Sequence, residues 1–176
     1  PTWTLPALPM MSMVDRLAGA VGEPVRSLFD VQVHRWLPLP GGPLRLRTEV
    51  RGAGAECSVT LLAWREAANP ALSRFEPVAS GRVNVRGGET ESVSPAPFAP
   101  LEDLVDEADP YASGALIHGT AFQYLVALKI GAAGSSAVLQ ADRGRVPRGA
   151  LHQGLLDAAT HGLPHDDLRR WSNRIP

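Results

Sequence analysis

The sequence predicts an α+β protein in which two units, each with one helix and an antiparallel sheet, follow one another along the chain. Two observations lead to this prediction. Stretches in which apolar and polar residues alternate, as is typical of strands, dominate the first half. Two apolar stretches with the helix period, near residues 10–21 and 151–162, lie one in each half. The 176 residues suffice for one sizeable core or for two small subdomains that share one.

Composition and charge exclude several classes of function. Hydrophobic residues make up 44% of the chain and charged residues 20%, and the net charge is -1, so nothing indicates a nucleic-acid or membrane-surface partner. No apolar run approaches the roughly 20 residues that a membrane span needs. Residues 1–20 lack the basic region of a signal peptide. Cys57 is the only cysteine, which excludes an internal disulfide and is consistent with a reducing cytoplasm.

The first unit is predicted over residues 1–90. Apolar residues recur at intervals of three and four from Met10 to Val21, and Gly22 follows, which predicts an amphipathic helix over Met10 to Val21. Strand-like stretches then cover residues 25–36, 43–52, 56–64 and 76–87, with turn-rich connections at 38–43 and 65–73. The unit should therefore contain one helix followed by about four antiparallel strands, with Cys57 buried and the basic stretch 42–52 on a solvated face.

A polar, proline-rich linker is predicted at residues 91–110, with a helical turn at Leu101–Val105. The second unit, residues 111–176, repeats the order with turn residues and an apolar segment at 111–131, a strand at 137–144 and a helix at 151–162. Two helices, each against a curled antiparallel sheet, are typical of two tandem hotdog units, a double hotdog. The sequence ends soon after the second helix, so we expect the second unit to be incomplete.

The helix at 151–162 carries the most informative polar residues. Asp157 and His161 are four positions apart and so share one helix face. Apolar or small neighbours (Leu155, Leu156, Ala158 and Ala159) indicate a helix that is buried nearly all round. Burial favours the protonated form of a carboxyl group, which can then donate a proton near neutral pH. The pattern leaves open a second interpretation, in which helix caps hold Asp157 and His161 is an ordinary histidine.

Two further segments could contact a ligand. His118 and Gly119 precede an apolar stretch that contains Phe122, and a glycine there would allow a ligand to approach the backbone closely. A plain turn leading into a strand explains this segment equally well. The prolines up to Pro9, followed by a methionine-rich helix, could form one wall of a tunnel for an acyl chain, or the methionines could simply be core.

The sequence lacks the residue spacings that nucleotide-binding, serine-hydrolase and metal sites require. The sequence contains none of the patterns GxGxxG, GxxxxGK[ST] or GxSxG, so nucleotide-binding and serine-hydrolase functions are not indicated. His161 and His165 are four residues apart, but Pro164 between them would break or kink a helix. Spacing within the sequence therefore predicts no metal site.

Three segments together carry a family resemblance. They read LPALPMMSMVDRLAGA at 5–20, ALIHGTAFQYL at 115–125 and LHQGLLDAATHG at 151–162. They resemble, in this order, the end of the HxxxGxxxxP motif, the YGPxFQ segment and the LxPxLLDxxxQ/H motif of the dehydratase domains of modular polyketide synthases and polyunsaturated-fatty-acid-type synthases. Tyr111 and Gly114 fall in the lead-in to the second motif. The resemblance covers essentially the whole chain.

The resemblance implies a reaction and its site. In such domains a histidine of the first half removes the proton alpha to a thioester, and an aspartic acid of the second half protonates the departing β-hydroxyl group. The substrate is a 3-hydroxyacyl chain on the phosphopantetheine arm of an acyl carrier protein. Asp157 would be the acid and His161 the residue that orients it. The substrate site would include Pro9, Tyr111, His118, Gly119 and Phe122.

The resemblance also implies partners. We expect an acyl carrier protein, other synthase domains and, because such hotdog domains commonly pair, a homodimer, all in the cytoplasm. No metal and no cofactor are expected apart from the phosphopantetheine of the carrier protein, and neither nucleic acid nor a membrane is expected as a partner.

Several positions depart from the family pattern. The catalytic histidine belongs at or just upstream of Pro1, and His34, in a predicted strand, does not replace it. Thr4 lies near the glycine position of the first motif, and His118 stands where the family has tyrosine. Two alternatives therefore stay open: a non-catalytic hotdog module that docks a carrier protein or holds a synthase dimer, and a hotdog thioesterase or product-template cyclase.

Overall fold

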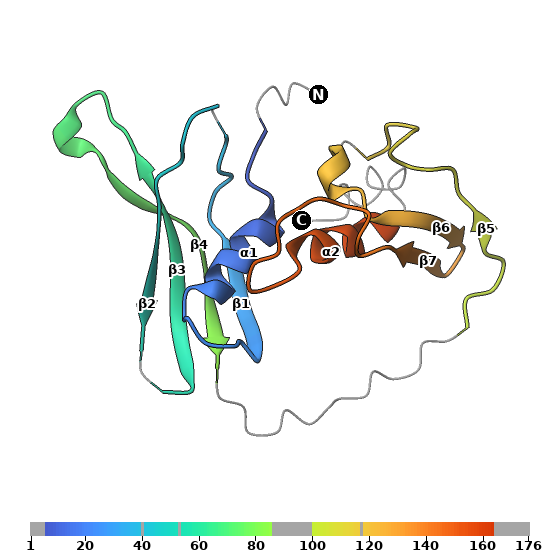
Figure 1. Ribbon diagram of the computed structural model, residues 1–176, viewed down its shortest axis with the longest axis horizontal. Coiled ribbons are helices and arrows are strands. Elements are labelled where there is room, and N and C mark those ends of the chain that lie inside the picture. The colour runs from blue at the N-terminus through green and yellow to red at the C-terminus, as the bar shows by residue number, and fades with distance from the viewer. Residues whose placement is uncertain (1–5, 40, 53, 86–99, 117, 164–176) are drawn as a thin grey trace. The chain divides into compact units, whose positions relative to one another are not determined.

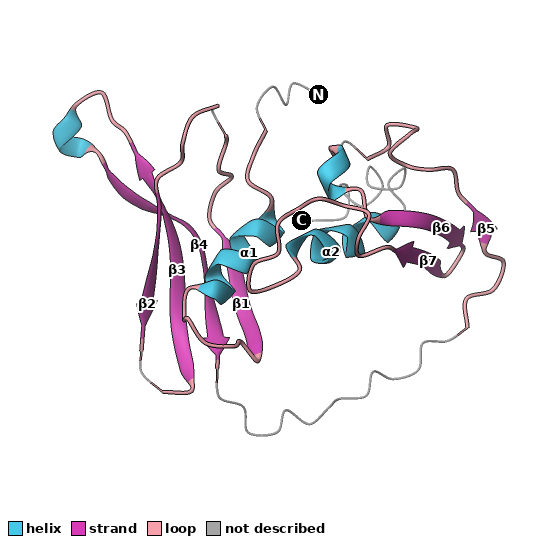
Figure 2. Ribbon diagram, in the orientation of Figure 1, coloured by secondary structure: helices cyan, strands magenta, loops and turns pink. Residues whose placement is uncertain are grey.

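The structure, a computed structural model, describes residues 6–39, 41–52, 54–85, 100–116 and 118–163. The chain divides into two units, Pro1–Ser92 with Gly149–His152, and Val93–Arg148 with Gln153–Pro176. Both combine helix and antiparallel sheet, as Figures 1 and 2 show. None of the helices in the described ranges has the length and apolar character that crossing a lipid bilayer would require.

The first helix, α1, spans Met10–Gly19 and confirms the prediction except at its end, which comes two residues before Val21. The carbonyl group of Pro9 accepts hydrogen bonds from the backbone N–H groups of Ser12 and Met13 and so starts the helix. Gly22 adopts a φ of 71°, a left-handed conformation that suits glycine and turns the chain toward the sheet.

Four antiparallel strands follow α1 and confirm the predicted sheet. They are β1 (Ser27–Val33), β2 (Leu46–Arg51), β3 (Glu56–Arg65) and β4 (Arg74–Asn84), in the order β1-β4-β3-β2. A bulge falls where Leu61 and Leu62 of β3 pair with Ala79 and Pro77 of β4. Such an irregularity bends a strand, and it accommodates a proline, which has no N–H group to give to the ladder.

The core of the first unit lies between one face of α1 and one face of the sheet. Residues at two-residue intervals on a strand point to the same face, and on β3 the buried series is Val59, Leu61 and Ala63. Met13 and Leu17 of α1 are fully buried against this series. Burying each large apolar side chain contributes about 1.5–3 kcal/mol. A helix laid on an antiparallel sheet is the expected hotdog arrangement, and Cys57 is buried as predicted.

The outer face of β2 is charged. Arg47, Glu49 and Arg51 alternate along this strand, and Glu49 forms ion pairs with Arg47 at 2.5 Å and with Arg51 at 3.3 Å. All three residues lie in the basic stretch predicted to face solvent. Arg47 and Arg51 are exposed, which confirms the prediction for them, whereas Glu49 is only partly exposed.

The second unit has a smaller sheet among its described residues. Its strands are β5 (Val105–Asp106), β6 (Leu125–Gly131) and β7 (Gly134–Leu139), in the order β5-β6-β7. The strand predicted at 137–144 therefore begins earlier and ends at Leu139. The helical turn predicted at Leu101–Val105 is wrong, since Val105 pairs with Ile130 in the sheet. Asp103 has a φ of 56°, which a right-handed helix does not permit.

The predicted helix at 151–162 forms as two pieces. The α-helix α2 spans Gln153–Ala158, and the 3-10 helix η3 continues it over Ala159–Gly162. Next to α2 lies the ring of Tyr124, whose exposed fraction is 1%. A Cβ atom at Gly154 of α2, or at Gly144 of the loop after β7, would overlap that ring. The two glycines thus let backbone approach the ring closely, and this contact fixes the position of α2.

Candidate active site

Asp157 lies on α2 and is largely buried. Its side chain is 16% exposed, and its Oδ2 atom has no accessible surface to speak of. The prediction that this helix is buried nearly all round is wrong, because Leu156, the residue before Asp157, is 41% exposed. One face of α2, which includes Gly154 and Ala158, packs inward. The carboxyl group therefore sits at the margin between packed interior and accessible surface.

His161 lies one turn after Asp157, in η3, and is 1% exposed. Its Nε2 atom is 3.3 Å from Oδ2 of Asp157. The expected pairing of these two residues at a spacing of four is therefore present, even though the helix tightens to 3-10 geometry between them. A buried imidazole at this distance can orient the carboxyl group or exchange a proton with it.

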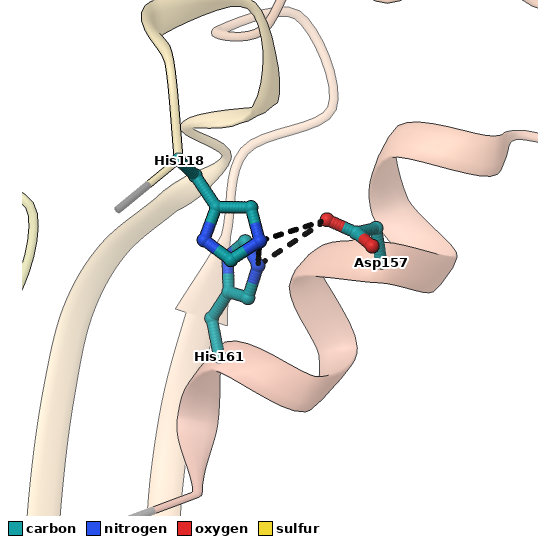
Figure 3. Close-up of side chains that lie close together, drawn as sticks. All are labelled: His118, Asp157 and His161. Atoms are coloured by element: carbon teal, nitrogen blue, oxygen red, sulfur yellow. Dashed lines mark hydrogen bonds and ion pairs between the residues drawn. The ribbon is translucent and has the colours of Figure 1, made fainter. Parts of the chain in front are cut away.

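His118 completes a cluster that we call the His-Asp-His cluster: His118, Asp157 and His161 (Figure 3). The Nε2 atom of His118 is 3.5 Å from Oδ2 of Asp157 and 3.2 Å from Nε2 of His161. His118 comes from the loop before the 3-10 helix η2 (Thr120–Phe122). Gln123 holds this loop by donating a hydrogen bond of 3.1 Å from its side-chain amide to the carbonyl group of His118.

Tyr111 contacts the cluster from the other side of His161. Its hydroxyl group is 2.8 Å from Nδ1 of His161 and accepts a hydrogen bond of 3.4 Å from the backbone N–H of Leu125. Burial raises the pKa of the Tyr111 hydroxyl group above its usual value of 10.0. The phenol is therefore neutral at physiological pH. Nδ1 of His161 thus faces the Tyr111 hydroxyl group and Nε2 faces the Asp157 carboxyl group, and these two contacts set the orientation of the ring.

The cluster has the composition to hold a proton or a cation. Oδ2 of Asp157 lies within ion-pair distance of both imidazoles, yet it accepts no well-aligned hydrogen bond from any residue in the described ranges. The ligand-type atoms of the three residues all lie within 4.8 Å of one another. Spacing along the sequence predicts no metal site because His118 is 43 positions from His161, too far for a local motif. His165, which is closer in sequence, lies outside the described residues.

The remaining predicted site residues have different positions. Gly119 precedes η2 and Phe122 ends it, so both shape the loop that carries His118, and their contact with a substrate stays a prediction. Pro9 belongs to the first unit, at the start of α1, and its role also stays a prediction. His34 directly follows β1, where its Nε2 atom lies 2.9 Å from the hydroxyl group of Ser80. It is not a member of the His-Asp-His cluster.

The way in which the site residues combine differs from the prediction. Tyr111 and His118 are predicted to contact substrate, and in the structure both of them contact His161. Gln123 was noted only as part of a motif, although it holds the His118 loop. One feature of the sequence could have indicated the contact between His118 and His161: residue 118 is a histidine where the resembled motif has a tyrosine. A pocket lined by residues 107–110 and 125–128 includes none of the predicted site residues.

Comparison with known proteins gives a match at the level of structure. No protein-family model matches the sequence, and no curated protein does. Among solved structures, the erythromycin dehydratase is 26% identical with a TM-score of 0.56, and the alignment covers 89% of this chain and 59% of that one. The dehydratase domain from the terminal module of the rifamycin polyketide synthase is 20% identical with a TM-score of 0.62, covering 89% and 60%.

A third similar structure is the dehydratase domain of the polyketide PpsC from Mycobacterium tuberculosis, at 20% identity and a TM-score of 0.61, with 90% of this chain and 59% of that chain covered. All three are described as dehydratases or dehydratase domains, and the likeness extends over both units of the present chain. The chain therefore has the hotdog fold of polyketide synthase dehydratase domains, and it spans about three fifths of the length of the solved structures that it matches.

Proposed function

We propose that the chain is part of a dehydratase domain of a polyketide or fatty-acid synthase, and that Asp157 is its acid. The observation that carries the proposal is the largely buried carboxyl group of Asp157, 3.3 Å from the buried imidazole of His161, in a chain with the fold of such domains. The substrate would be a 3-hydroxyacyl thioester on the phosphopantetheine arm of an acyl carrier protein. The products would be an enoyl thioester and water.

The elimination needs one base and one acid. The base removes the proton from the carbon alpha to the thioester, and the electrons of that bond form the double bond to the β-carbon. The bond from the β-carbon to oxygen breaks, and the hydroxyl group leaves as water with the proton of Asp157. By the resemblance, the base is the histidine of the HxxxGxxxxP motif, whose position falls at or upstream of Pro1.

Within this proposal the neighbours of Asp157 position its proton. His161 faces the carboxyl group with Nε2 and the Tyr111 hydroxyl group with Nδ1, so a rotation of its ring would disrupt both contacts. His118 approaches the same carboxylate oxygen from the η2 loop. We further propose an acyl carrier protein and other synthase domains as partners, a cytoplasmic location, and no cofactor apart from the phosphopantetheine of the carrier protein.

The test uses the full-length protein and a 3-hydroxyacyl-carrier-protein substrate, with products followed by mass spectrometry. Asp157→Asn keeps the shape of the side chain but cannot donate the acidic proton, so it should abolish loss of water. Asp142→Asn is the matched control, because Asp142 is exposed in the loop after β7, and it should retain activity. Undiminished water loss in Asp157→Asn would remove this residue from the acid role.

One sequence observation favours a second candidate, a non-catalytic module that docks carrier protein or joins synthase subunits. Thr4 stands near the position of the glycine in the HxxxGxxxxP motif, and a changed motif is what a lost activity would leave behind. In the same assay this candidate predicts an unmodified substrate even for the unaltered protein. A free acid would instead indicate a thioesterase, and an aromatic ring a product-template cyclase.

A further inference from the structure

We propose that the His-Asp-His cluster is a binding site for a zinc ion. The three atoms that would bind it are Nε2 of His118, Oδ2 of Asp157 and Nε2 of His161. Their mutual separations are 3.2, 3.3 and 3.5 Å. In a tetrahedral zinc site with ligand bonds of about 2.0–2.1 Å, two ligand atoms are about 3.3 Å apart. The three atoms therefore already lie at the spacing of one face of a zinc tetrahedron.

The chemistry of the three atoms favours zinc over the hard cations. Calcium and magnesium select oxygen ligands, and this cluster offers two imidazole nitrogens and one carboxylate oxygen. Two histidines and one carboxylate are a ligand set of zinc sites that keep a fourth position for water or another small ligand. His118 is 32% exposed and Asp157 is 16% exposed, so an ion can reach the cluster from solvent.

A supporting residue of the kind that metal sites use is also present. A histidine that binds zinc through Nε2 usually donates its Nδ1–H to a polar partner, which sets the tautomer and the orientation of the ring. At His161 that partner is the Tyr111 hydroxyl group, 2.8 Å from Nδ1. In the tautomer with the proton on Nδ1, the lone pair of Nε2 points toward His118 and Asp157.

The carboxylate supplies an independent reason to expect a cation. Oδ2 of Asp157 is buried, and no residue within the described ranges gives it a well-aligned hydrogen bond. A buried carboxylate oxygen in that state is costly, and a cation bound between the three atoms would offset the cost. The same ion would relieve the close approach of the two Nε2 atoms, which otherwise requires a proton between them.

Zinc binding and the proposed acid role exclude each other. A carboxylate oxygen bound to zinc holds no proton to give to a departing hydroxyl group. Zinc would therefore inhibit the elimination, a consequence that rests on the proposed function of Asp157. The binding site itself does not depend on that function, and it can be tested without any turnover.

The test uses the full-length protein, produced without a histidine tag and stripped of metal by chelator and dialysis. Zinc binding is measured by competition with a chromophoric chelator, and cobalt(II) substitution is followed by visible absorption. The unaltered protein should bind one zinc ion at this site and give the strong bands of tetrahedral cobalt. Since loss of a supporting hydrogen bond typically costs about 10–100-fold in metal affinity, Tyr111→Phe should fall in that range and His118→Ala should lose more.

Controls separate this site from others. His34→Ala removes a histidine of the first unit and should bind zinc as the unaltered protein does. His118→Tyr, which introduces the residue of the resembled motif, should fold and still lose the site, and thermal melts would verify folding. The proposal is overturned if the unaltered protein gives no tetrahedral cobalt spectrum, or if zinc affinity survives both His118→Tyr and Asp157→Asn.

Failure of this proposal is distinguishable from failure of the proposed function. Suppose that the unaltered protein binds one zinc ion and that the Asp157→Asn variant still eliminates water at the full rate. The metal site would then stand, and Asp157 would lose the acid role. Absence of zinc binding together with an inactive Asp157→Asn would do the reverse.

Discussion

His161 is the residue on which the geometry of the site depends. Its two ring nitrogens face the Tyr111 hydroxyl group at 2.8 Å and the Asp157 carboxyl group at 3.3 Å. Because burial raises the pKa of the Tyr111 hydroxyl group, this phenol stays neutral throughout the pH range in which imidazoles titrate. Tyr111 therefore acts on Asp157 through His161, as a positioning residue.

Replacing His161 by glutamine should reduce water loss less than replacing Asp157. The glutamine amide can donate a hydrogen bond to the carboxyl group, so part of the orientation of Asp157 is kept. We expect kcat to fall by roughly tenfold with KM nearly unchanged, because orientation contributes to the transition state rather than to binding. If His161→Gln were as inactive as Asp157→Asn, the imidazole itself would have to take part in proton transfer.

Tyr111→Phe should lower the free energy of unfolding by about 1–3 kcal/mol, the cost of leaving the buried Nδ1 of His161 and the Leu125 N–H group without their partner. Chemical denaturation measures this change. Ser136→Ala, at an exposed position of β7, is the control and should change stability by less than about 0.5 kcal/mol. Equal stability of the two variants would show that the Tyr111 hydroxyl group contributes nothing to the fold.

Among the elements, α2 is the one whose placement decides whether a site exists. It is short, and its backbone at Gly154 packs directly against the buried ring of Tyr124, which holds the helix in place. Six residues do not form a stable helix by themselves, so packing must hold it. A change at this contact should therefore move Asp157 without altering any residue of the site.

Gly154→Ala tests this dependence. The added methyl group would overlap the Tyr124 ring, and overpacking of this kind costs about 1–3 kcal/mol, against a gain of about 1 kcal/mol from better helix propensity. We expect a lower thermal midpoint and reduced water loss. Gly42→Ala, where nothing lies within 4 Å of the new methyl group, should leave both unchanged. A fully active and stable Gly154→Ala protein would contradict the proposed role of this contact.

Elements could be predicted from the sequence where local period and burial agree. In α1 and the strands of the first unit, the regularly spaced apolar residues are the ones that pack in the core, so their spacing predicts each element. The turn predicted at 101–105 failed because pairing of Val105 with Ile130 overrides local preference. The approach of His118 to His161, 43 positions away, has no local pattern at all. Asp157 and His161 were found because one helical turn joins them.

At the scale of the whole molecule, the hydrophobic core cluster between α1 and the four-stranded sheet lies in the first unit. Leu17 is fully buried between α1 and the sheet, and Leu17→Ala should lower the free energy of unfolding by about 2–5 kcal/mol. Met10→Ala on the same helix is the control, since Met10 is 42% exposed and its loss should cost much less. Denaturant unfolding compares the two, and similar values would mean that α1 does not anchor this core.

The charged outer face of β2 has a consequence for how molecules meet. β2 is the last strand of its sheet, and the last strand of a sheet offers unpaired backbone groups to any other chain. If a second β2 paired alongside with Glu49 opposite Glu49, Arg47 would face Arg51, so every facing pair would carry like charges. Electrostatic repulsion thus disfavours this symmetric pairing of two β2 edges.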